Sequence, residues 1–174
     1  MRYSLPLPPT LLACALLLAC GDAPPTSPSA GGASFAATPE RPFGGGCAFQ
    51  STVLAPEPGQ PANVTRFHQD LECRLTHLGL TTGTTLEIAT FTATGPVFVT
   101  TAVYTAANGD QLFTVQNGTA TPPANGAINF SFTETVTGGT GRFADASGSF
   151  SGAGVVFMAT QSGQWEYSGG SLSY

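Results

Sequence analysis

The chain has 174 residues, and only 9% of them carry a charge. The formal net charge is −5 at pH 7, all five basic residues are arginines, and they form no cluster. This balance excludes nucleic acid and anionic lipid headgroups as electrostatic partners. Threonine, serine, glycine and alanine are abundant. Threonine and serine evidently fill the solvent-facing positions in place of lysine and glutamate, which is typical of β structure.

The first segment has the layout of an export signal. Arg2 is followed by an apolar run over residues 11–20, which is shorter than the roughly 20 residues a membrane-spanning helix needs. Leu17-Leu18-Ala19-Cys20 resembles the bacterial lipobox, in which signal peptidase cuts before a cysteine that carries a diacylglyceryl group. We therefore expect residues 1–19 to be a signal peptide and Cys20 to be the lipid attachment site. An ordinary secretory signal is the alternative.

A tether is expected between this lipidated cysteine and the folded domain. Residues 21–37 consist mainly of proline, serine, alanine and glycine and bury too little apolar surface to offset the entropy of ordering. Residues 20–42 are accordingly predicted to be a disordered, lipidated tether whose partner is a membrane. Gly21 is not the aspartate that resembles an inner-membrane retention signal, so the expected location is the cell envelope, by default the outer membrane.

Residues 43–174 divide into short β-prone runs separated by turn residues, and none of the runs has a helical period. We predict an all-β domain of about eight antiparallel strands, closed into a small barrel because closure removes exposed strand edges. An open sandwich is the alternative architecture. The expected strands cover residues 47–54, 64–78, 84–94, 97–106, 111–116, 127–137, 147–159 and 164–174.

Cys47 and Cys73 remain in the mature chain, each on the apolar side of its predicted strand. In an exported protein such a pair favours a disulfide. A metal site is the alternative, but no zinc-type spacing of cysteine and histidine accompanies either residue, so no metal and no cofactor is predicted.

A glycine-rich motif carries a family resemblance. Residues 138–148, GGTGRFADASG, are similar to the G-G-T-G-[KR]-F-A-x-A-x-G signature of dirigent and allene-oxide-cyclase-like barrels. Residues 76–79 and 107–110 resemble short segments of exported bacterial proteins that carry a similar motif. The resemblance implies a calycin-like barrel. Within the motif we expect glycines at positive-φ turn positions and Phe143 at the start of the next strand, facing the core. A phosphate-binding loop is disfavoured because no Walker lysine and no following helix are present.

The densest set of titratable side chains alternates along one predicted strand: Arg66, His68, Asp70, Glu72 and Arg74. Since Phe67, Leu71 and Leu75 take the opposite face, we favour a solvated outer surface of weak ion pairs for this stripe. The alternative is a polar cavity wall in which His68 is a catalytic base oriented by Asp70 or Glu72. His77, at a strand end, is expected to make a structural hydrogen bond, with a place at a cavity mouth as the alternative.

No nucleophile elbow or other catalytic motif is found, so the sequence does not predict an enzyme. The favoured function is structural or interaction-related, as a barrel displayed on the tether. A barrel that binds a small hydrophobic ligand is the first alternative, and it requires a lumen that is not packed solid. A dirigent or allene-oxide-cyclase-like isomerase or cyclase is the second, and it requires at least two ionisable side chains that point into a cavity. Trp165 and Tyr167 are expected to share a face and fill a barrel end.

Overall fold

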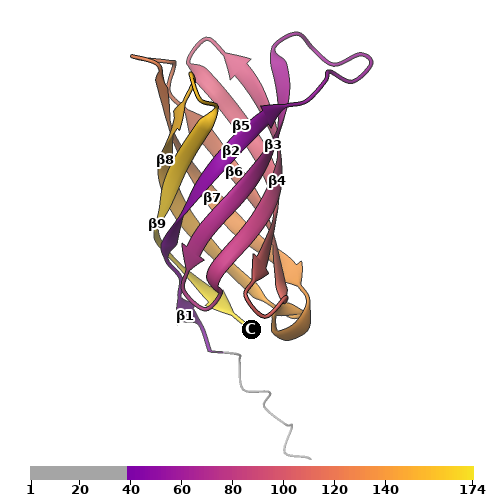
Figure 1. Cartoon of the computed structure of the whole chain (residues 1–174), viewed down its shortest axis with the longest axis vertical. Coiled ribbons are helices and arrows are strands. Elements are labelled where there is room, and N and C mark those ends of the chain that lie inside the picture. The colour runs from indigo at the N-terminus through magenta and orange to yellow at the C-terminus, as the bar shows by residue number, and fades with distance from the viewer. Residues whose placement is uncertain (1–38) are drawn as a thin grey trace, which may run out of the picture. The chain divides into compact units, whose positions relative to one another are not determined.

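The computed structural model describes residues 39–174, which form an antiparallel β-barrel (Figure 1). The predicted signal peptide, Cys20 and most of the predicted tether lie outside the described residues. Arg41 and Pro42, which were expected in the tether, form the short strand β1 and pair with Leu172 and Ser171. The eight barrel strands are β2 (Gly45–Val53), β3 (Val64–Leu75), β4 (Gly79–Thr92), β5 (Gly95–Ala106), β6 (Gln111–Ala120), β7 (Ala127–Gly139), β8 (Ser147–Phe157) and β9 (Ser162–Ser173).

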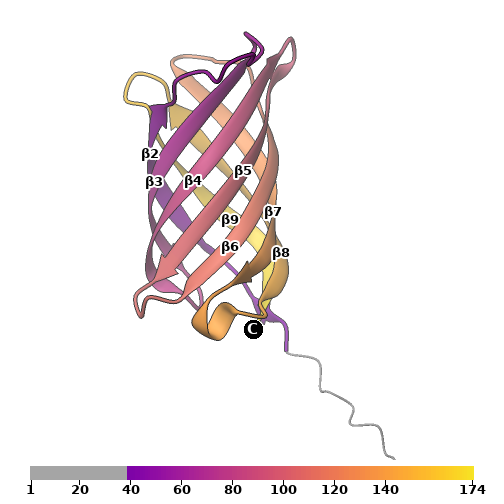
Figure 2. The same cartoon turned by 90° about the vertical axis from the view of Figure 1, so that its right-hand side faces the viewer.

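Each of the strands β2 to β8 pairs with the next one along the chain, and β9 also pairs with β2. The eight strands therefore close on themselves, as the two views in Figures 1 and 2 show. This confirms the predicted eight-stranded barrel and makes the open sandwich wrong. No helix in the described part of the chain is both long and apolar enough to cross a membrane.

The barrel has two distinct ends. At one end the β3–β4, β5–β6 and β7–β8 turns gather with β1 and the carboxyl terminus, and we call this the closed end (Figure 2). At the other, which we call the open end, lie the longer β2–β3 connection over residues 54–63 and the loops after β4, β6 and β8. The described chain thus enters the barrel at its closed end.

Two turns differ from the sequence prediction. The strand expected to reach Leu78 ends at Leu75, because His77 adopts φ of 69° and turns the chain into β4. Phe143 does not begin the next strand: β7 continues to Gly139, and Phe143 lies in the 3-10 turn Gly141–Phe143 before β8. Its ring is fully buried and packs against Tyr174, with centroids 5.0 Å apart, so the glycine-rich motif plugs the closed end.

Aromatic packing fills the interior near the closed end. The rings of Phe43 and Phe150 stack with centroids 4.0 Å apart, and Tyr167 meets both edge-on. This half of the lumen is a packed hydrophobic core, which small eight-stranded barrels commonly have.

The predicted disulfide is also confirmed. Cys47 and Cys73 are direct cross-strand partners between β2 and β3 and form a disulfide.

Phenylalanine rings in the other half lie against the barrel wall over glycines of the neighbouring strand. Phe49 is the cross-strand partner of Gly163, and Phe98 of Gly118. A Cβ atom at either glycine would collide with the ring of its partner, so each ring occupies the space that a side chain would take. Phe130 over Gly154 and Phe132 over Gly152 repeat the arrangement. Each of these rings therefore leans over the neighbouring strand, into the space that the glycine leaves free.

Candidate functional site

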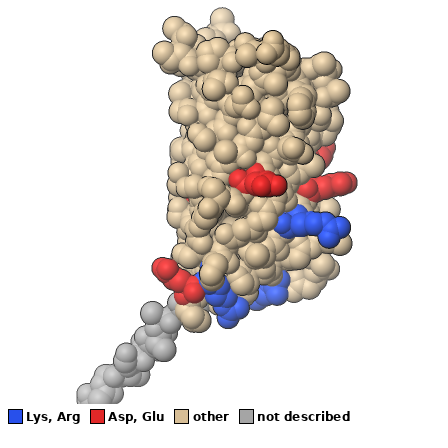
Figure 3. All heavy atoms as spheres, turned by 90° about the vertical axis from the view of Figure 1, so that its left-hand side faces the viewer, with Lys and Arg blue, Asp and Glu red and all other residues tan. Residues whose placement is uncertain are grey.

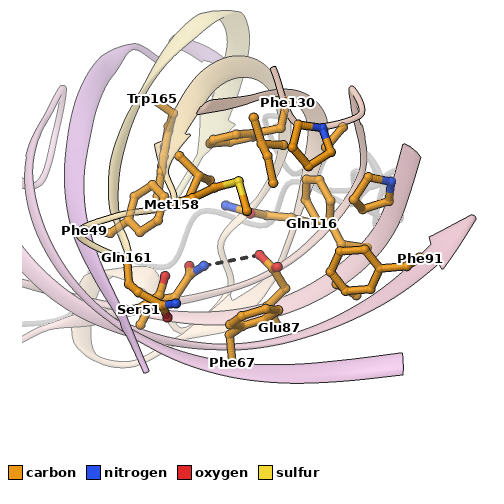
Figure 4. Close-up of a pocket in the computed structure, with 18 residues that line it drawn as sticks. Phe49, Ser51, Phe67, Glu87, Phe91, Gln116, Phe130, Met158, Gln161 and Trp165 are labelled. Carbon is orange, nitrogen blue, oxygen red and sulfur yellow. Dashed lines mark hydrogen bonds between the residues drawn. The ribbon is translucent and has the colours of Figure 1, made fainter. Parts of the chain in front are cut away.

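A cavity of about 230 Å³ occupies the barrel interior at the open end. Residues from all eight barrel strands and from the loops at this end line it, and Figure 4 shows their side chains converging on one space. The volume corresponds to about eight water molecules at their share of liquid volume, and to a ligand of one or two rings. The lumen is therefore packed at one end and hollow at the other.

Six aromatic side chains dominate the wall of this cavity: Phe49, Phe67, Phe91, Phe98, Phe130 and Trp165. Several of them touch each other, since the Phe49 and Trp165 centroids lie 5.3 Å apart and those of Phe98 and Phe130 lie 6.1 Å apart. Met158, from the β8–β9 loop, reaches over the cavity from the open end (Figure 4). A wall of this composition binds apolar and aromatic groups.

One carboxyl group points into this apolar space. Glu87 projects inward from β4 between its cross-strand partners Phe67 and Thr100 (Figure 4). Its Oε2 accepts a hydrogen bond of 3.3 Å from Gln69 Nε2, and Gln69 in turn accepts one of 2.9 Å from the Thr85 hydroxyl. Burial raises the pKa of Glu87 to about 7, and the neighbouring Gln69 amide and Thr100 hydroxyl oppose this rise only in part.

A second carboxyl group lies deeper, in the packed half. Glu134 of β7 is fully buried and accepts hydrogen bonds from Thr114, from Gln116 Nε2 at 3.0 Å and from the Tyr167 hydroxyl at 2.7 Å. Burial raises its pKa, and these three donors counteract the rise. Gln116 also lines the cavity, so its amide joins the cavity floor to the Glu134 network.

Two buried polar atoms have no hydrogen-bond partner within residues 39–174: the Thr100 hydroxyl oxygen and Trp165 Nε1. Thr100 is paired in register with Glu87, and Trp165 lines the cavity. Unpartnered buried polar groups cost about 1–3 kcal/mol each and are uncommon outside functional regions. Both atoms are enclosed by protein and face no open space, so they do not by themselves indicate a ligand.

The polar stripe predicted from the sequence lies on the outside of the barrel. Gln69, Leu71 and Cys73 of β3 are buried, whereas the alternate residues of the strand point away from the lumen. His68 and Asp70 lie 3.4 Å apart with side chains 42% and 71% exposed, and Arg66 pairs with Glu57 on the β2–β3 connection. None of His68, Asp70 and Glu72 lines the cavity. On the face in Figure 3, charged side chains lie at mid-height and toward the closed end.

His77 also lies far from the cavity, at the closed end. Its Nε2 bonds the carbonyl oxygen of Pro42 at 2.9 Å, and its own carbonyl accepts a bond of 2.7 Å from Arg142. Arg142 also pairs with Asp110 at 3.7 Å. These contacts tie three turns together and contribute to the plug at this end. No group of three or more potential metal ligands occurs in residues 39–174.

Sequence analysis missed Glu87 because the pattern of β4 is inverted. Thr85, Glu87 and Ala89 face the lumen, while Leu86 and Ile88 face solvent and are 36% and 45% exposed. Hydrophobicity alone assigns the opposite faces. The signal that could have found Glu87 is the register with β3, which places it opposite the inward-facing Phe67.

No protein-family model matches this chain, and no curated protein matches its sequence. Among solved structures, a chain described as pyocyanin demethylase is similar with a TM-score of 0.41 and 18% sequence identity, over 72% of this chain and 98% of that one. A likeness of this size carries no argument about what the barrel binds or does.

Proposed function

We propose that this protein binds a small, mainly apolar molecule in the cavity at the open end of its barrel. The observation that carries the proposal is the cavity itself, since the same strands pack tightly at the closed end and leave about 230 Å³ between aromatic walls at the other. A purely structural barrel gains stability by filling that space, because each cavity costs packing energy. Ligand binding requires a lumen that is not packed solid, and the open half of this barrel has such a lumen.

An isomerase or cyclase is not favoured. That alternative requires two ionisable side chains in a cavity, and among the described residues that line this cavity Glu87 is the one ionisable group. Glu134 lies beneath the floor and already accepts three hydrogen bonds from the protein.

The test measures binding of 4-(dimethylamino)benzonitrile, an uncharged one-ring probe whose fluorescence rises in apolar surroundings. We expect saturable enhancement with the folded domain. Ala89→Phe, which fills the cavity from β4, is expected to weaken binding at least tenfold, and Ala153→Phe, an equal change on the outer face of β8, to leave it unchanged. Ala120→Phe at the mouth is a second filling variant in case Ala89→Phe does not fold. Absence of saturable enhancement, or equal effects of inner and outer substitutions, contradicts the proposal.

We also propose that the protein is a lipoprotein of the cell envelope, attached to a membrane through Cys20. The lipobox-like residues 17–20 support this, as does the disulfide, which is typical of exported proteins. Labelling of expressing cells with an alkyne analogue of palmitate is expected to mark the wild-type protein but not Cys20→Ala, while Cys14→Ala keeps the label. Equal labelling of the Cys20→Ala protein, or none of the wild type, contradicts the assignment.

A further inference from the structure

The interior of the barrel holds two carboxyl groups, and no cationic side chain lines its cavity among the described residues. Glu87 and Glu134 both point inward, and none of the arginines and histidines described lines the cavity. Arg66 is occupied by Glu57 on the outside, Arg142 by Asp110, and Arg41 bonds the Tyr174 hydroxyl at the closed end. An ionised carboxylate in an apolar site without a partner is costly, so Glu87 favours any ligand that brings a positive charge.

The two inward carboxyl groups differ in how far the protein satisfies them. Glu134 accepts three hydrogen bonds and has no access to solvent. Glu87 accepts one long bond, from Gln69 to Oε2, and faces the open space of the cavity (Figure 4). Its remaining acceptor capacity points toward whatever occupies that space. Glu134 is thus a structural group, and Glu87 is available to a ligand.

The aromatic walls favour the same kind of ligand. The faces of phenylalanine and tryptophan rings carry partial negative charge and attract a cation held within about 6 Å, with a gain of about 2 kcal/mol or more where water is excluded. Six such rings line the cavity that Glu87 faces. An anionic ligand is disfavoured, because Glu87 and the ring faces repel it and no positive group lines the cavity to offset that repulsion.

Resting on the proposed function, we propose that the natural ligand is a small amine that binds as a monocation. Its ammonium group donates hydrogen bonds to Glu87, and its apolar body, one ring or a short alkyl chain, packs among Phe49, Phe130 and Trp165. A cavity of about 230 Å³ admits a body of that size and excludes large lipids.

The experiment compares three ligands of nearly equal size, 2-phenylethylamine, 2-phenylethanol and 3-phenylpropanoate, by their displacement of the fluorescent probe 4-(dimethylamino)benzonitrile. At pH 8 we expect the amine to bind at least tenfold more tightly than the alcohol, and the carboxylate most weakly. In Glu87→Gln, which removes the charge at constant shape, the ratio of amine to alcohol affinity falls to about one. Glu72→Gln removes a carboxylate from the outside of β3 and is expected to keep the ratio.

The outcomes separate the two proposals. Equal affinity for amine and alcohol in a wild-type protein that binds the fluorescent probe overturns the amine proposal and leaves ligand binding intact. Failure of the wild type to bind the fluorescent probe, the amine and the alcohol overturns both. An unchanged ratio in Glu87→Gln also overturns the amine proposal.

A second measurement needs no variant. Because the amine requires ionised Glu87, its affinity is expected to fall about tenfold between pH 8 and pH 6, while alcohol binding changes little. The other titratable groups that face the lumen are Glu134, Tyr104 and Tyr167, and burial raises the pKa of both tyrosine hydroxyls well above their ordinary values. Amine binding that does not change between these pH values contradicts the proposal.

Discussion

The two halves of the barrel interior are built from the same eight strands, but they differ in how completely side chains fill the lumen and in how many hydrogen bonds the inward carboxyl group accepts. Near the closed end Phe43, Phe150 and Tyr167 fill the lumen, and Glu134 receives three hydrogen bonds. Near the open end the rings lie against the walls, and Glu87 receives one bond. Natural proteins break the rules of packing and polar satisfaction mainly where they function. The closed half therefore stabilises the fold, and the open half is suited to binding.

The largest contrast between the halves is expected from truncating one ring in each. Phe150→Ala removes a ring that is 2% exposed and stacked on Phe43, and we expect a loss of about 3–5 kcal/mol in the free energy of unfolding. Phe91→Ala removes a cavity-lining ring that is 42% exposed, and we expect a loss of about 1 kcal/mol or less. Urea denaturation of the two variants measures both values, and similar losses would break the comparison.

The disulfide is expected to stabilise the fold without affecting the cavity. Cys47 and Cys73 are separated by 26 residues, and opening that loop costs about 3–4 kcal/mol on the chain-entropy model. The double variant Cys47→Ala/Cys73→Ala should lose this amount in urea denaturation and still bind the fluorescent probe at low temperature. A loss of binding in a folded double variant would show that the halves are coupled.

The pH dependence of stability should report on Glu87. Its pKa is about 7 in the folded barrel and 4.5 without the fold, so the folded state holds the proton more tightly. The stability that this group contributes is greatest below pH 4.5 and falls as the pH rises through 7, by about 3 kcal/mol in all. Urea denaturation of Glu87→Gln should show a smaller fall, with the remainder from Glu134, whose pKa is also raised. Equal falls in both proteins would place the titration elsewhere.

The smallest effects are expected on the outer stripe. His68 and Asp70 form an exposed pair, and such pairs contribute about 0–1 kcal/mol. His68→Ala and Asp70→Asn should therefore change the free energy of unfolding by about 0.5 kcal/mol or less. Both variants should bind the fluorescent probe as the wild type does. A tenfold loss of binding in either would restore the interpretation of this stripe as functional.

The barrel and the disulfide could be predicted because several strands alternate cleanly between polar and apolar residues. β3 is the best example, since its apolar positions 67, 71, 73 and 75 all face inward and set the orientation of Cys73. The sites of the turns were also readable. Their shape at Phe143 was not, because a buried 3-10 turn depends on the ring of Tyr174, which lies 31 positions further along the chain.

The cavity could not be predicted, because it depends on the register between strands. No local pattern in β5 or β6 indicates that Phe98 lies over Gly118, and the same holds for Phe49 and Gly163. The position of Glu87 inside the lumen follows from its neighbours on β3 and β5, against its own flanking residues Leu86 and Ile88. Functional features built from such cross-strand pairs are visible only once the strands are aligned.

The chain enters the barrel at the end opposite the cavity mouth, and this arrangement determines how a ligand would arrive. If Cys20 carries a lipid, as proposed, the anchor would pull on the plugged end, where β1 pairs with β9, and would leave the loops around the mouth unobstructed. Molecules would then enter from the surrounding water, without first having to be extracted from the bilayer. That route suits a compound with appreciable aqueous solubility, and it predicts that capture depends on diffusion through the fluid next to the membrane.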